Sequence, residues 1–221
     1  MKTLLVTLFL SLVVASSAAA ANWPDSRLDA AATAAAGKPV AVWCEDSWAD
    51  WIHVGDDQSV DFSDVLGFAV PSVTNTIYIG PTQCENLHLL LDAGTAQVGP
   101  ALASRAVHTL VHESLHVGLD SGDESLVDCT ALKQDDDIAV QFFGFHKTDT
   151  VTSTKVVPVT KRVAVKQMRK GKLDVVGHKT VVTAFKTVTT TTQVPSQLLA
   201  AFHADDLAWH KSTPPEYQTD C

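Results

Sequence analysis

The sequence predicts an α+β protein in which a compact domain of helices and one small sheet carries an inserted basic β-hairpin. Three observations lead to this expectation. Of the 221 residues, 46% are hydrophobic and 19% are charged, which suits a folded core and excludes a disordered chain. Several segments show helical spacing of apolar residues, separated by short strand-like runs. The segment 147–195 is rich in Thr, Val and Lys and alternates with a period of two.

The first 20 residues have the organisation of a secretory signal peptide. Lys2 is followed by an apolar run over 4–14 and then by small residues up to Ala21. Cleavable signals have this order of charge, apolar stretch and small residues, whereas a membrane anchor needs about 20 apolar residues. We therefore expect residues 1–20 to be removed, giving a secreted, extracellular protein with no stable membrane insertion.

Charge is distributed unevenly along the chain. The formal net charge is −9, which argues against a nucleic-acid-binding protein. Between Lys147 and Lys186 there are ten basic residues and two acids, while the rest of the mature chain has five basic residues and 23 acids. This asymmetry predicts parts with different roles: a main domain over 21–146, a basic insertion over 147–195, and a C-terminal helix and tail over 196–221 that return to the domain.

Local patterns predict the elements of the main domain in order. We expect a helix over 25–37, a strand over 38–44, a loop-rich acidic segment over 45–64, strands over 66–73 and 76–79 compatible with a hairpin, and helices over 84–92, 100–117 and 121–143. Gly99-Pro100 is typical of a helix start, and Gly118 of a helix end.

The insertion is predicted to be one long β-hairpin with its turn at Arg169–Lys172. A poorly ordered Thr-rich linker is the alternative. Its positive charge suits docking on an anionic cell-wall polymer or an acidic substrate, or folding against the acidic segment 45–64 of the same chain. After it, Ser196 is expected to cap a last helix that ends near His210.

Four cysteines remain, at positions 44, 84, 129 and 221. An even number in an exported chain indicates two disulfides, and three pairings are possible. We favour Cys44–Cys84 and Cys129–Cys221. A cysteine-based metal site is disfavoured because the chain has no C-x-x-C motif.

One helix carries the motif H-E-x-x-H at His112, Glu113 and His116. Histidines four residues apart on a helix project from one face, at the separation that a single Zn²⁺ needs. Glu113 lies beside that face, where it can take a proton from water held by the zinc. The opposite face of this helix is apolar, which favours a metal site over the alternative of solvent-exposed histidines.

A catalytic zinc needs a third protein ligand and an open position. Glu124, near the start of the next helix, can supply the ligand. One turn later, Asp128 can accept the free ring N–H of a ligand histidine. Two alternatives stay open: Glu124 can form a capping box with Ser121, and an aspartate at position 120 or 123 can be the ligand instead.

H-E-x-x-H followed by E-x-x-x-D, within residues 100–132, resembles the gluzincin zinc metallopeptidases. Small exported bacterial proteins of unassigned activity, with a compact site and paired cysteines, resemble it more closely. The resemblance implies a zincin-like catalytic domain over 21–146 that hydrolyses peptide bonds in a peptide or protein substrate. It also implies zinc ligation by His112, His116 and Glu124, Glu113 as the general base and Asp128 as the partner of a ligand histidine.

Other residues are weaker candidates. The donor that stabilises the oxyanion is not determined among Tyr78, Tyr217, His146, His203 and His210. His108 can line the cleft or be a hydrogen-bonded histidine. The strand 76–79 can be a substrate-pairing edge strand or core sheet. The tryptophans at 43, 48 and 51 can form a binding platform or pack internally.

A monomer is expected. The competing function is a non-catalytic exported binding protein with a structural metal and a basic arm that contacts an anionic surface.

Overall fold

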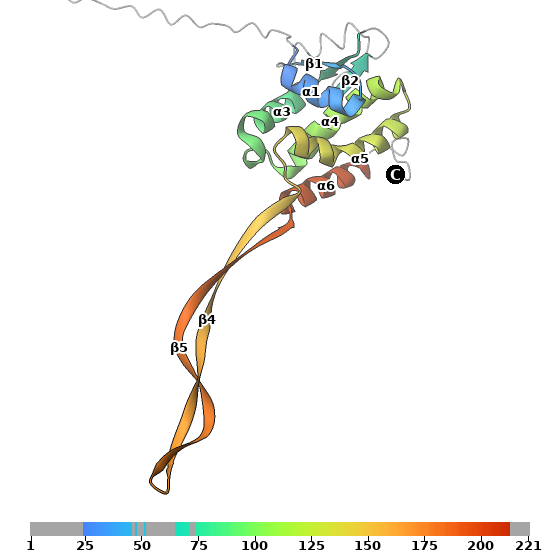
Figure 1. Cartoon of the computed structure of the whole chain (residues 1–221). Helices are drawn as coiled ribbons and strands as arrows, with labels where there is room; N and C mark the ends of the chain where they lie inside the picture. Colours follow the sequence, from blue (N-terminus) through green and yellow to red (C-terminus); the bar gives the residue numbers. More distant parts are fainter. Residues whose placement is uncertain (1–23, 46, 48–50, 52–64, 71–73, 213–221) are drawn as a thin grey trace, which may run out of the picture.

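The computed structural model describes residues 24–45, 47, 51, 65–70 and 74–212, and these form a helical body with a small sheet, from which a two-stranded ribbon projects (Figure 1). The predicted α+β class with an inserted hairpin is confirmed. The predicted signal segment 1–20 lies outside the described residues. Among those described, no helix has both the length and the apolar character to cross a bilayer.

The small sheet has three strands, β1 (Ala41–Cys44), β2 (Gly67–Val70) and β3 (Thr76–Ile79), in the order β1-β3-β2. The antiparallel pairing of β2 with β3 fits the expected hairpin, and β1 runs parallel to β3. The suggestion that 76–79 is an edge strand is wrong, because β3 is paired on both sides. Ile77 and Ile79 are fully buried, so one face of β3 belongs to the core.

Five helices make up most of the described body: α1 (Ser26–Ala36), α3 (Pro81–Ala93), α4 (Pro100–Leu119), α5 (Glu124–Phe142) and α6 (Gln197–His210), with a 3₁₀ turn at Gly94–Ala96. Asp25 caps α1 by accepting the Arg27 N–H, and Ser196 caps α6 as expected. Proline occupies the first position of α3 and of α4, where it has no hydrogen bond to lose. Helix α4 lies in the middle of the body, buried along most of its length (Figure 1).

The end of α4 differs from the prediction. The helix continues through Gly118 to Leu119 and ends at Asp120, whose φ of 49° is left-handed. Gly118 serves packing instead, because a Cβ there would lie 2.6 Å from the carbonyl oxygen of Ala36. This glycine therefore allows α1 to approach α4 closely.

The disulfide Cys44–Cys84 is confirmed and joins β1 to α3 with a Cα–Cα distance of 5.6 Å. Cys129, on α5, is also disulfide-bonded. Its expected partner, Cys221, lies outside the described residues, so that pairing stays a prediction.

Strands β4 (Thr148–Arg169) and β5 (Lys172–Pro195) form the hairpin, which extends away from the helices (Figure 1). The turn consists of Lys170 and Gly171, with φ of 46° and 77°, as two-residue hairpin turns require. The alternative of a Thr-rich linker without structure is therefore not supported. Most of the acidic segment 45–64 lies outside the described residues, so docking of the hairpin on it stays untested.

The ends of the hairpin meet at the body, where the Ser196 N–H donates to the Lys147 carbonyl at 3.1 Å. Beyond this junction, Phe145 and Phe202 pack edge to face in the core with ring centroids 4.9 Å apart.

We expect that replacing residues 148–194 by a short Gly/Ser linker leaves the melting temperature of the body within a few degrees of wild type. Circular dichroism during heating measures this, and a chain that no longer folds would contradict the proposed domain division.

Candidate metal centre

Helix α4 and the first residue of α5 bring three polar side chains to one point. The Nε2 atoms of His112 and His116 are 3.1 Å apart. The Glu124 Oε2 atom lies 3.1 Å from the first and 3.3 Å from the second. These three side chains could therefore hold a metal ion together.

Glu124 is free to face the histidines because other residues cap α5. Asp123 is the N-cap and accepts the Leu126 N–H at 3.1 Å, while the Ser121 hydroxyl accepts the Asp123 N–H at 3.1 Å. The capping-box alternative for Ser121 and Glu124 is therefore wrong. Within the described part of the chain, neither Asp120 nor Asp123 joins the group around His112 and His116.

Each histidine of the group has a partner for its other ring nitrogen. His116 Nδ1 lies 2.7 Å from the Ser121 carbonyl oxygen, to which it can donate. His112 Nδ1 lies 3.4 Å from Asp128 Oδ1. Such partners fix the tautomer that leaves Nε2 with a lone pair for a metal. The sequence predicted that Asp128 is the partner of a ligand histidine. It could not predict the contact with Ser121, because every residue has a backbone carbonyl.

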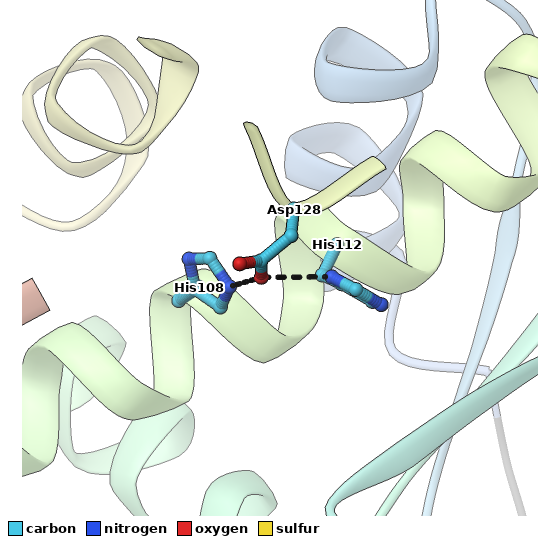
Figure 2. A group of neighbouring side chains, drawn as sticks. All are labelled: His108, His112 and Asp128. Carbon is cyan, nitrogen blue, oxygen red and sulfur yellow. Dashed lines mark hydrogen bonds and ion pairs between the residues drawn. The ribbon is translucent and has the colours of Figure 1, made fainter. Parts of the chain in front are cut away.

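Asp128 also holds His108, as Figure 2 shows, with its carboxylate between the two imidazoles. His108 is fully buried, with Nε2 2.8 Å from Asp128 Oδ1 and Nδ1 2.7 Å from Asp135 Oδ2. Burial alone would lower the pKa of His108, but the Asp135 charge and the two hydrogen bonds outweigh it and raise this pKa to about 10. His108 is thus a buried imidazolium that supports Asp128.

The polar network continues into α6. His210 Nδ1 is hydrogen-bonded to Asp128 Oδ2, and Asp206 Oδ1 lies 3.4 Å from His108 Nδ1. Burial and the neighbouring charge of Asp135 raise the pKa of Asp206 to about 9, so this carboxyl group is protonated at neutral pH. The folded network therefore holds two protons, on His108 and on Asp206.

Because the folded state holds these two protons, its stability should depend on pH. In the unfolded chain His108 and Asp206 titrate near 6.5 and 3.8, so above pH 6.5 the folded state binds more protons than the unfolded state. The free energy of unfolding should then fall as pH rises from about 6.5 to about 9, by at most about 1.4 kcal/mol per pH unit for each proton.

Urea denaturation at several pH values tests this dependence, with Asp206→Asn as the comparison. This variant cannot bind the second proton, so its stability should fall less steeply with pH. His112 and His116 also have raised pKa values in the metal-free protein and contribute to both slopes. Equal slopes for variant and wild type would contradict the assignment of a proton to Asp206.

A cavity of about 960 Å³ opens beside the group formed by His112, His116 and Glu124. Its walls include residues 65–69 at β2, His116 on α4 and Trp209 on α6, and Glu113 lies in the same wall, almost completely buried. Burial raises the pKa of Glu113, an effect that the nearby His112 and His116 partly offset.

Two residues of this cavity carry no motif signal. A Cβ at Gly67 would lie 2.9 Å from Glu113 Cγ and 3.0 Å from Thr109 Cγ2, so only glycine lets β2 approach α4 this closely. Trp209 packs edge-on against His108 with ring centroids 4.8 Å apart, and its place follows from the docking of α6.

None of the described oxyanion candidates lines the cavity. Tyr78 stacks on Phe68 at 4.6 Å, His146 is exposed, His203 lies 3.2 Å from Asp136 and His210 is hydrogen-bonded to Asp128. Tyr217 lies outside the described residues.

The tryptophans are not a shared binding platform in the part of the chain that is described. Trp51 is fully buried and contacts Phe68, and Trp43 is tilted against Tyr78 at 5.9 Å. Trp48 lies outside the described residues.

No family model matches this chain, and neither a curated protein nor a solved structure matches it. Its function is therefore inferred from its own residues.

Proposed function

We propose that the protein is a secreted, gluzincin-like zinc metallopeptidase that hydrolyses peptide bonds. The observation that carries this proposal is the triangle of His112 Nε2, His116 Nε2 and Glu124 Oε2, with sides of 3.1, 3.1 and 3.3 Å. Tetrahedral Zn²⁺ binds such nitrogen and oxygen ligands at about 2.0–2.2 Å, which separates the ligand atoms by about 3.3 Å. Two histidines and one glutamate are also a known ligand set of catalytic zinc.

The number of ligands favours catalysis over a structural metal. A structural zinc site is closed by four protein ligands, whereas a catalytic site has three and keeps one position open. Among the described residues, no fourth His, Cys, Asp or Glu joins the group. The cavity beside the group gives a substrate access to it.

Glu113 is the proposed general base. Bound zinc would polarise the scissile carbonyl and make water acidic. Glu113 would accept a proton from the attacking water and donate it to the leaving amine nitrogen, after which the C–N bond is broken. Burial raises the pKa of Glu113 in the metal-free protein, which makes its carboxylate a stronger base.

The edge of β2 is the proposed binding site for an extended peptide. In the described sheet β2 is an outer strand, and residues 65–69 line the cavity. An extended peptide can bind by adding a strand to the outer strand of a sheet through backbone hydrogen bonds. Secretion is consistent with the disulfide Cys44–Cys84, because disulfides persist in oxidising compartments.

Elemental analysis of the purified mature protein and a peptide library test this function together. We expect one zinc per chain and cleavage that a chelator abolishes and added zinc restores. Well under one zinc per chain after zinc addition would overturn the metal site. Stoichiometric zinc with no peptide cleaved would overturn the peptidase function and favour a metal-containing binding protein.

A further inference from the structure

The hairpin has two chemically different faces. Side chains alternate along β4, and each cross-strand pair shares a face. The pairs Lys155↔Val188, Val157↔Lys186, Lys161↔Val181, Val163↔Lys179 and Arg169↔Lys172 all fall on the face of the odd-numbered β4 residues. This basic face therefore carries six exposed cations.

The even-numbered face carries fewer cations, and its large apolar side chains are the most exposed on the hairpin. The pairs Val156↔Thr187, Pro158↔Phe185 and Thr160↔Val182 lie on it, followed by Arg162↔Thr180, Ala164↔His178 and Lys166↔Val175 and then by Met168. Phe185, Met168 and Val156 are 70%, 68% and 62% exposed. Side chains this apolar and this exposed are typical of an interaction surface.

Near the turn, cationic and apolar side chains lie within one short stretch of the chain. Lys166, Arg169, Lys170 and Lys172 are four cations within seven residues, and Met168 lies among them. Val165 and Val175 are exposed beside them. The ribbon twists along its length (Figure 1), so only a short part of it can face a flat surface at one time. This tip, residues 165–175, has the highest density of cations on the hairpin, with three exposed apolar side chains among them and one acid at position 174.

We infer that the tip binds membranes that contain anionic lipids. A soluble polyanion would satisfy the cations but leave the apolar side chains in water. A lipid interface satisfies both, since apolar side chains enter the acyl boundary while Lys and Arg reach headgroup phosphates. The inference concerns the hairpin alone and is independent of the zinc site.

Co-sedimentation with vesicles tests the inference, using phosphatidylcholine vesicles with and without 30% phosphatidylglycerol. The wild-type protein should bind the anionic vesicles at least tenfold more tightly than the neutral ones. The quadruple variant K166Q/R169Q/K170Q/K172Q should lose at least tenfold in this affinity. Met168→Ser with Val175→Ser should also weaken binding, and the remaining binding should be more sensitive to salt.

The chain offers a matched control in K155Q/K161Q/K179Q/K186Q, which removes the same charge from the shaft of the hairpin. This variant should retain at least half of the wild-type affinity. Three results would overturn the inference: no binding to anionic vesicles, equal losses in the tip and shaft variants, or binding to dextran sulfate as tight as to vesicles and unaffected by Met168→Ser. The last result would identify a soluble polyanion instead.

Discussion

Glu113→Gln is expected to bind zinc with wild-type stoichiometry and to cleave peptides about a thousandfold more slowly. Glutamine has nearly the same size and shape as glutamate but cannot accept a proton, and general acid–base groups contribute about 10²–10⁴ to rate. Zinc should stay bound because Glu113 is not in the group of converging atoms formed by His112, His116 and Glu124. Folding should also be retained, since burial already disfavours the charged form of Glu113.

Parallel measurements of zinc content, melting temperature and the kcat for one library-derived peptide separate these effects. Glu85→Gln is the matched control, because it makes the same chemical change at an exposed position of α3. It should leave all three values unchanged. Wild-type kcat in Glu113→Gln would exclude Glu113 as the base, whereas a loss of zinc in this variant would indicate that Glu113 is a ligand.

Local features were predictable from the sequence because they depend on neighbours in the chain. Proline at the start of α4, alternation in β4 and β5, and the Lys170-Gly171 turn follow from backbone geometry at short range. The spacing of His112 and His116 belongs to the same class, because helical geometry alone puts them on one face.

Features that depend on how distant elements pack were not predictable. His210 and Asp128 are hydrogen-bonded across 82 residues of sequence, and Asp206 reaches His108 from the same helix. No local pattern specifies that α6 docks beside α4, so the buried network and Trp209 were missed. Whether 76–79 is an edge strand or core sheet stayed open for the same reason, since its second partner, β1, comes from an earlier part of the chain.

Removal of a ligand histidine should have the largest effect on metal binding. His116→Ala deletes one of the three converging atoms and leaves only His112 and Glu124, which lie 3.1 Å apart. Loss of a group that only orients a ligand typically costs about 10–100-fold in metal affinity. Deletion of a ligand itself should cost more, so we expect the zinc affinity of His116→Ala to fall at least a hundredfold.

A series of variants should follow a defined order of zinc affinity. Asp128→Asn changes the partner of His112 Nδ1 and should lie between wild type and His116→Ala in zinc affinity. His203→Ala is the control, because His203 lies at the surface near Asp136 and should be without effect. Competition with a chromogenic chelator gives the affinities, and circular dichroism shows whether each variant is folded.

The order of zinc affinities also tests which set of side chains binds the zinc. Two other sets of converging atoms could hold a metal ion, and both include His108: one with His112 and Asp128, the other with Asp135 and Asp206. If zinc occupied either of these sets, His116→Ala would retain full affinity and His108→Gln would lose it. We expect the reverse order, because both ring nitrogens of His108 already hydrogen-bond to buried carboxylates, whereas the Nε2 atoms of His112 and His116 converge with Glu124 Oε2 beside the cavity.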